Sequence, residues 1–233
     1  IKAILEAKSL TVKRTAAASA LAASYLSRKD SNSMLMIGTG ALSTNLIKAY
    51  ASIRPIKKVF VWGRNFEKAQ AISTALKNES FSIQPIKTIE EKISEVDIVS
   101  CATLSKTPLV LGKYLKAGQH IDLVGAYKKD MREADDAALQ KSKLFVDSYD
   151  TTLGHIGELK IPLESGAIDR SHLRADYYDL EAFQAGPDDI TVFKNGGGAH
   201  LDLMTARYVL DQWPARAGAA ALDKTGNARA GRV

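Results

Sequence analysis

The chain has little of what marks several large classes of protein. Among its 233 residues there is one cysteine, and aromatic residues make up only 7%. A single cysteine excludes an internal disulfide framework, and Cys101 lies in an apolar run where a small buried residue fits, so we expect a cytoplasmic protein. The chain has no uncharged apolar run approaching the roughly 20 residues that cross a bilayer, so we expect no association with a membrane.

Dense charge of one sign is also missing. The net charge of +6 raises the question of nucleic acid, because a basic face is the footprint of phosphate-backbone binding. The lysines and arginines are instead scattered singly among acids, and the densest patches are pairs at 57–58 and 128–129 without interleaved aromatic residues. We therefore expect no nucleic-acid partner.

From residue 33 the sequence repeats a pattern of apolar run, polar turn and amphipathic helix. We expect strands at 34–38, 57–63, 81–86, 96–102, 119–126, 143–148 and 190–194. We expect helices ending near 52 and spanning 66–78, 89–94, 132–142 and 173–183, with another opening after the glycines at 196–198 and a loop-rich stretch after 147. Strands without strict alternation are buried on both faces, which predicts an α/β fold with a parallel sheet covered by helices.

The two ends of the chain are expected to differ from this pattern. Residues 1–11 alternate like a short strand or hairpin that is already under way at Ile1, so we expect a fragment. Thr15 is then expected to cap a helix from Ala16 to about Leu26. The tail beyond Trp213 is rich in Ala, Gly and Arg, and we expect it to be frayed or mobile.

Residues 38–43, Gly-Thr-Gly-Ala-Leu-Ser, lie between an expected strand and an expected helix. In a dinucleotide-binding turn, Gly38 would permit the tight bend and Gly40 would let a pyrophosphate approach the backbone at the helix N-terminus. Ser43 replaces the third glycine of that fingerprint and is small enough for close packing. Two further strand-helix units downstream favour a cofactor site over an ordinary turn.

The end of the second expected strand lacks the acidic residue that would hold the ribose hydroxyls of NAD. Gly63, Arg64 and Asn65 stand there, with Lys68 one turn further on. A guanidinium with neighbouring donors suits a 2'-phosphate, so we expect NADPH, with NADH possible. The alternative is that Arg64 is a solvated arginine at a strand end.

Several segments in the same order resemble the ornithine cyclodeaminase/mu-crystallin family, from residue 10 onward. They are RTAAASALA, MIGTGALS, VWGRN, CATLSKTP, VGAYKKDMREADD, LFVDS, GELKIPLESG and ITVFKNGGGAHLDL. The resemblance implies a Rossmann-type doubly wound parallel sheet plus the remnant of a second domain for substrate and dimerisation. It assigns 1–30 to the end of that second domain, 31–197 to the NAD(P)-binding domain, and 198–233 to a helix returning to the first domain with a mobile tail. Roughly the first quarter of a family subunit would be absent, and the full-length protein would be a homodimer.

The resemblance also implies site residues. Arg14 corresponds to the arginine that grips the substrate carboxylate, and a bidentate guanidinium next to a helix N-terminus is reasonable in that role; the alternative is a surface arginine before a helix. The expected cofactor contacts are Gly38, Thr39, Gly40, Ala41, Leu42, Ser43, Arg64, Asn65, Lys68, Thr103, Leu104, Ser105, Val124, Tyr127, Asn195 and Gly196.

Tyr127 is an informative departure from the family pattern. Cyclodeaminases of the family carry a catalytic aspartate at this position, and without it ornithine cyclisation loses its acid/base group. The segment resembles the ketimine reductases, which implies NADPH-dependent reduction of the small cyclic imino acids delta-1-pyrroline-2-carboxylate or delta-1-piperideine-2-carboxylate to L-proline or L-pipecolate. The alternatives are a cyclodeaminase or amino-acid dehydrogenase of the family, or a mu-crystallin-like protein that binds NADPH and a ligand.

The histidines are too far apart for a recognisable metal-binding spacing, so we expect no bound metal. They are His120, His155, His172 and His200. His200 follows three glycines at an expected helix start and joins Tyr127 as a candidate catalytic residue. The alternative is a helix-start histidine bonded to a neighbour.

Overall fold

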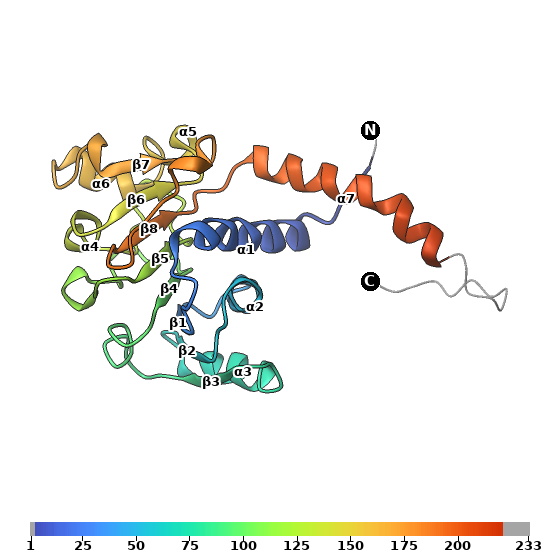
Figure 1. The fold of residues 1–233 in the computed structure, drawn as a ribbon, viewed down its shortest axis with the longest axis horizontal. Coiled ribbons are helices and arrows are strands. Elements are labelled where there is room, and N and C mark those ends of the chain that lie inside the picture. Colours follow the sequence, from blue (N-terminus) through green and yellow to red (C-terminus); the bar gives the residue numbers. More distant parts are fainter. Residues whose placement is uncertain (1–2, 221–233) are drawn as a thin grey trace.

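The computed structural model describes residues 3–220 and has one eight-stranded sheet in which every pairing is parallel (Figure 1). The strand order is β3-β2-β1-β4-β5-β8-β6-β7. The strands are β1 (Ser33–Ile37), β2 (Lys58–Trp62), β3 (Ser82–Pro85), β4 (Ile98–Cys101), β5 (His120–Leu123), β6 (Lys143–Val146), β7 (Leu173–Ala175) and β8 (Thr191–Lys194). The expected doubly wound α/β fold is confirmed.

Helices cover both faces of this sheet. The α-helices in the described residues are α1 (Ala7–Leu26), α2 (Ser43–Ile53), α3 (Phe66–Ala75), α4 (Asp136–Gln140), α5 (Tyr149–Thr152), α6 (Gly157–Glu164) and α7 (Ala199–Ala220), and the last of these does not cover the sheet. In β1, Met34 and Met36 pack into a core shared with α1, α2 and α3. Leu35 and Ile37 point the other way, into a core shared with α4 and α6. This two-sided burial explains why the strands read as unbroken apolar runs.

The expected strand or hairpin near the N-terminus is wrong. Helix α1 begins at Ala7, and the carboxylate of Glu6 accepts hydrogen bonds from the backbone N–H groups of Lys8 and Ser9. Thr15 therefore lies inside the helix rather than at its cap. The alanine-rich sequence favours a helix, and a carboxylate cap starts it nine residues earlier than the apolar pattern indicated. The end at Leu26 is as expected, and residues 1–2 and 221–233 lie outside the described part of the chain.

Several other expected helices are also shorter or absent. The stretch 132–142 contains only α4, which Asp135 caps, because residues 133–134 bond to a distant carboxylate instead of a helical neighbour. The stretch 173–183 forms β7 and a short 3-10 turn (η3, Leu180–Ala182), and 89–94 forms turns. The loop-rich stretch after 147 contains α5 and α6.

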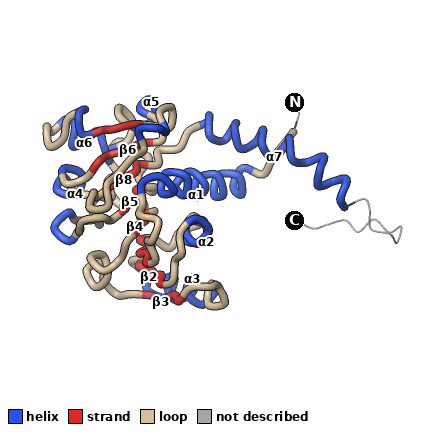
Figure 2. Tube along the Cα trace, in the orientation of Figure 1, coloured by secondary structure: helices blue, strands red, loops and turns tan. Residues whose placement is uncertain are grey.

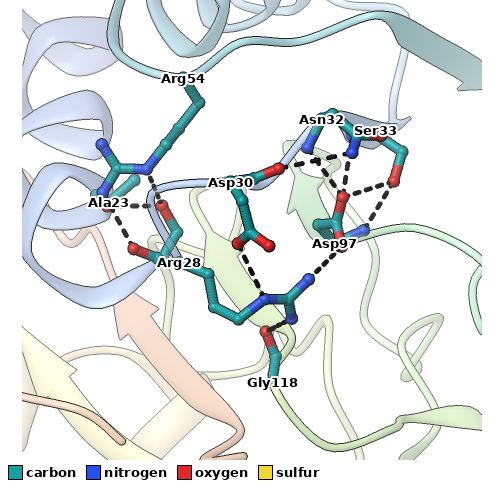
Figure 3. A network of polar contacts seen from close by, with 9 residues as sticks. Ala23, Arg28, Asp30, Asn32, Ser33, Arg54, Asp97 and Gly118 are labelled. Carbon is teal, nitrogen blue, oxygen red and sulfur yellow. Dashed lines mark hydrogen bonds and ion pairs between the residues drawn. The ribbon is translucent and has the colours of Figure 1, made fainter. Parts of the chain in front are cut away.

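A polar network lies at the amino ends of the strands, at the start of β1 (Figure 3). Arg54, just after α2, donates to the carbonyl oxygens of Ala23, Ser24 and Ser27 at the end of α1. Asp97 accepts from the backbone N–H of residues 32 and 33 and pairs with Arg28. The network fixes the end of α1 against the sheet. The glycine-rich turns lie at the other side, where the carboxyl ends of the strands meet.

Helix α7 extends away from the sheet, on the same side as α1 (Figure 2). Four of its large apolar side chains are exposed: Leu203, Met204, Tyr208 and Trp213. Of the helices in residues 3–220, none is long and apolar enough to cross a membrane. The assignment of residues 198–233 to a helix that returns to a separate domain stays a prediction.

Candidate functional site

Two adjoining pockets lie at the carboxyl ends of the strands. The outer pocket has a volume of about 490 Å³ and the inner pocket about 400 Å³. Both are lined by Gly40, Ala102, Thr103 and Leu104, so they adjoin along these four residues, and we call the two pockets together the cleft. Ligands of open parallel sheets bind at this edge, where the strand order reverses.

The structure places almost every expected cofactor residue on this cleft. The outer pocket contains Gly38, Thr39, Arg64, Asn65, Lys68 and Ser105. The shared part contains Gly40, Thr103 and Leu104. The inner pocket contains Ala41, Leu42, Val124, Tyr127, Asn195 and Gly196 together with Arg14. Ser43 lines neither pocket.

The turn after β1 has the geometry that the glycines suggested. Gly38 has a φ of +121°, and a Cβ there would overlap the Ala102 carbonyl oxygen, so the turn requires glycine. A Cβ on Gly40 would meet no atom within 4 Å, which leaves its backbone open to the cleft. Ser43 is buried, and its hydroxyl donates to the Gly38 carbonyl oxygen at 2.9 Å. Ser43 therefore stabilises the turn after β1 and does not face the cleft.

The outer pocket ends at two exposed cations, Arg64 and Lys68. Asn65 caps α3, because its side-chain oxygen accepts from the Lys68 backbone N–H at 3.1 Å. This cap sets where α3 begins and so keeps the lysine on the pocket rim. Positive charge therefore lies at the end of β2, and no carboxylate stands there. Both conditions suit the binding of a phosphate group.

Arg14 projects from the middle of α1 into the inner pocket. The alternative of a surface arginine before its own helix is wrong, because α1 begins at Ala7 and the Arg14 side chain is only 12% exposed. The guanidinium lies beside the N-terminus of α7 instead. Its Nε donates to Asp202 Oδ1 on α7 at 2.8 Å. A Cβ on Gly197 would come within 3.0 Å of an Arg14 terminal nitrogen, so glycine leaves room for the guanidinium. Its two terminal nitrogens can then face a ligand carboxylate side by side.

A buried aspartate positions the glycine turn after β8. Asp147 accepts hydrogen bonds from the backbone N–H of Gly197 at 2.5 Å and of Ser148 at 2.9 Å. Burial raises the pKa of Asp147, while these backbone donors act in the opposite direction. The Asn195 amide donates to the Thr15 carbonyl oxygen and to Ser19 on α1. The turn is thereby docked between β6 and α1.

The two candidate catalytic residues have different positions. Tyr127 is 56% exposed and lines the inner pocket, with the Lys128 ammonium 5.4 Å from its ring centroid. His200 lies in the first turn of α7 and lines neither pocket. A Cβ on Gly198 would lie 2.7 Å from its ring, so the imidazole packs directly against the glycine turn.

The family model for "Ornithine cyclodeaminase/mu-crystallin family" matches residues 1–217. The chain belongs to this family. It is 44% identical over 214 residues to the delta(1)-pyrroline-2-carboxylate reductase of Paracoccus denitrificans, covering 90% of this chain and 68% of that protein. The family resemblance expected from the sequence segments is confirmed.

Solved structures agree with this family membership. The delta(1)-pyrroline-2-carboxylate reductase of Thermococcus litoralis in complex with NADH and L-proline has a TM-score of 0.85 at 32% identity, covering 89% of this chain and 66% of that one. An archaeal alanine dehydrogenase dimer with bound NAD has a TM-score of 0.82 at 26% identity, covering 89% and 65%. The chain therefore spans about two thirds of the length of these relatives.

Sequence reasoning assigned no role to three acids around the site: Glu133, Asp147 and Asp202. Asp147 directly follows an apolar strand, which is where a carboxylate reaches the functional edge of a parallel sheet, so a signal existed. Glu133 lies in the mixed-charge run DMREADD, which reads as a solvated surface. Asp202 is recognisable only through its long-range partner Arg14. In the described part of the chain no cluster of three or more His, Cys, Asp or Glu side chains is arranged to hold a metal.

Proposed function

We propose that the cleft binds NADPH, or NADH, and that the chain is the cofactor-binding part of a ketimine reductase. The substrate class is a cyclic imino acid, delta-1-pyrroline-2-carboxylate or delta-1-piperideine-2-carboxylate, and the product is L-proline or L-pipecolate. The observation that carries the proposal is the Arg14 guanidinium in a pocket continuous with the glycine-rich turn after β1. Relatives named delta(1)-pyrroline-2-carboxylate reductase support it.

The cleft fits a dinucleotide. Gly40 leaves space beside the backbone for a pyrophosphate, at the start of α2, where no side chain caps the helix N-terminus. Arg64 and Lys68 at the outer end favour the 2'-phosphate of NADPH over the bare hydroxyl of NADH. Since the solved relatives contain NADH or NAD, the preference for NADPH rests on these two cations alone.

A bound nicotinamide would supply a hydride for the carbon of the protonated imine, and the chain's own residues bind and orient the substrate. Arg14 holds the carboxylate through its terminal nitrogens, because its Nε is already bonded to Asp202. Leu42, Ala102 and Val124 line the inner pocket with apolar surface and exclude water from the reacting atoms.

The inner pocket favours reduction over cyclodeamination. Tyr127 occupies the position at which cyclodeaminases of the family carry their catalytic aspartate, and none of the described residues that line this pocket is acidic. Deamination of ornithine needs a carboxylate to move protons, whereas hydride addition to a protonated imine needs mainly positioning and charge complementarity.

We further propose that the natural protein is a homodimer. Helix α7 exposes the large apolar side chains Leu203, Met204, Tyr208 and Trp213, which a protein interface would bury. The alanine dehydrogenase relative, described as a dimer, supports this proposal.

Three assays on the same preparation test the proposed activity. Oxidation of NADPH on addition of either cyclic imine is the expected result. Ammonia release from ornithine would instead support a cyclodeaminase, and cofactor binding without turnover of imines or amino acids would support a ligand-binding protein. Either of these two results without imine reduction would overturn the proposal.

A further inference from the structure

Glu133 is a fully buried carboxylate next to the shared part of the cleft. One of its oxygens accepts from the Thr103 backbone N–H at 2.7 Å and from the Thr103 hydroxyl at 2.8 Å. The other accepts from the backbone N–H groups of Gly125 at 2.6 Å and Ala126 at 3.2 Å. A single side chain therefore ties the segment after β4 to the segment after β5.

The two segments approach each other so closely that side chains between them are excluded. A Cβ on Gly125 would overlap both the carbonyl oxygen and the nitrogen of Thr103. Thr103 and Gly125 both line the inner pocket, and Thr103 also lines the outer one. Thr103 and Gly125 form what we call the floor of the cleft. The distance between the two segments that carry them is set by the Glu133 carboxylate that joins them.

Glu133 is itself held from behind. The backbone N–H groups of Glu133 and Ala134 donate to the two carboxylate oxygens of Glu158 at 2.8 and 2.9 Å, and Glu158 is also fully buried. The Glu133 carbonyl oxygen accepts from the backbone N–H groups of Leu109 and Val110. The side chain that ties the segments therefore has a fixed base, and its reach cannot adjust freely.

The chemistry of these contacts requires an acceptor oxygen on both sides of the side chain. Three of the four donors are backbone N–H groups, which can only donate, so every one needs an acceptor oxygen. An amide at position 133 would offer one acceptor oxygen and turn an NH₂ group toward other N–H groups. The Thr103 hydroxyl donates its proton to Glu133 and accepts from the Ser105 backbone N–H, so it has no proton to donate to a ligand in the cleft.

We propose that Glu133 is a positioning residue for the cofactor, acting through Thr103 and Gly125 to set the floor of the cleft where the two pockets join. The inference rests on the proposed function, because it takes a nicotinamide dinucleotide as the occupant of the cleft. It goes beyond that function in assigning the geometry of the site to a buried residue that touches neither substrate nor cofactor.

Asp97 offers a matched control at the opposite edge of the sheet. Its carboxylate also accepts from backbone N–H groups, those of Asn32 and Ser33, and from the Ser33 hydroxyl (Figure 3). Asp97→Asn therefore makes the same change of carboxylate to amide against backbone and hydroxyl donors, and it also removes the ion pair with Arg28. Both variants should lower the melting temperature, but only the one at position 133 disturbs the cleft.

The experiment measures the Kd for NADPH and NADH by fluorescence titration, without substrate, well below the melting temperature of each variant of the natural protein. For Glu133→Gln we expect the Kd of the preferred cofactor to rise at least tenfold, and for Asp97→Asn to stay within about twofold of the unmodified protein. Glu133→Asp keeps the charge but loses one methylene of reach, so its Kd should fall between these values.

An unchanged Kd for Glu133→Gln, or an equal rise for Asp97→Asn, would overturn the inference and leave the proposed function standing. If Glu133→Gln does not fold, Glu133→Asp decides: a rise of about threefold or more supports the role, and an unchanged Kd contradicts it. If the unmodified protein binds neither cofactor, the proposed function itself fails.

Discussion

Arg14 on α1 and Asp202 on α7 form an ion pair across 188 positions of sequence, with 2.8 Å between Nε and Oδ1. The pair joins the two helices that flank the inner pocket. It also fixes the plane of the guanidinium, because rotation about the last side-chain bonds would break the contact at Nε. The carboxylate of Asp202 is thus expected to orient the group that binds the substrate.

Removing Asp202 should weaken substrate binding without affecting the cofactor. The Asp202 side chain is 40% exposed, so solvent screens the pair and its loss is worth about 0.5 to 1 kcal/mol. We therefore expect Asp202→Asn to raise KM for the cyclic imine about two- to fivefold, with an unchanged Kd for NADPH. Glu164→Gln, which removes the exposed Lys160–Glu164 pair, serves as the control and should change neither constant. A cofactor Kd that rises in parallel with KM would contradict this role.

The preference between cofactors should depend on Arg64. Arg64→Ala removes the charge-assisted hydrogen bonds to a 2'-phosphate, which are worth about 1 to 3 kcal/mol, and should abolish most of the preference for NADPH over NADH. The measurement is the ratio of kcat/KM for the two cofactors. Lys77→Ala, at an exposed position after α3 that lines neither pocket, should leave the ratio unchanged. If Arg64→Ala also leaves it unchanged, the assignment of Arg64 is wrong.

Tyr127 should contribute packing rather than a proton. Tyr127→Phe keeps the ring beside the inner pocket, so imine reduction should stay within about tenfold of the unmodified rate, equivalent to about 1.4 kcal/mol of barrier. If the phenol protonates the imine nitrogen, the loss should instead reach about a hundredfold. Single-turnover rates with NADPH separate the two outcomes. Tyr127→Asp, which restores the cyclodeaminase carboxylate, should weaken imine reduction and give at best traces of ornithine deamination.

The buried carboxyl of Asp122 should make stability depend on pH. Burial raises the pKa of Asp122 from 3.8 to about 6, although Ser100 and Ser19 donate hydrogen bonds to it. The folded protein therefore holds this proton over a pH range in which the unfolded chain has released it. Because the folded state binds more protons there, this group's contribution to stability falls as pH rises from about 4 to about 6.

Asp122→Asn should remove this loss of stability at higher pH, because an amide does not titrate. Both partners are hydroxyls, so the Ser100 hydroxyl can rotate to accept from the new amide while Ser19 continues to donate. We expect the variant to be more stable than the unmodified protein at pH 7 to 8 by on the order of 2 kcal/mol, with the difference vanishing near pH 4. Urea unfolding across this pH range measures it. A difference that does not change with pH would show that Asp122 does not titrate as described.

Local sequence predicted the parts of this molecule that are built locally. Seven strands were recognisable as apolar runs, most of them buried on both faces, whereas β7 lies in a stretch that was expected to be helical. The turn after β1 was recognisable because Gly38 and Gly40 are close in the chain. The start of α1 was missed because the cap Glu6 lies outside the apolar pattern. The helix expected at 132–142 was too long because Glu133 and Ala134 bond to Glu158.

The same distinction holds for the site. Residues within recognisable motifs, such as Arg64 and Asn195, were placed on the cleft from sequence alone. Glu133 and Asp202 were not, because their importance depends on partners 30 and 188 positions away. A charged residue in a mixed-charge run gives no sign of being buried until the fold brings backbone donors around it.

Arg14 tests the account most directly. The measurement is steady-state oxidation of NADPH by delta-1-pyrroline-2-carboxylate, compared between the unmodified protein and Arg14→Met, with the cofactor Kd determined for both. We predict turnover by the unmodified protein, a loss of at least about a hundredfold in kcat/KM for the variant from its lost charge-assisted hydrogen bonds, and an unchanged cofactor Kd. Cofactor binding without oxidation by either cyclic imine, or an Arg14→Met variant as active as the unmodified protein, would contradict it.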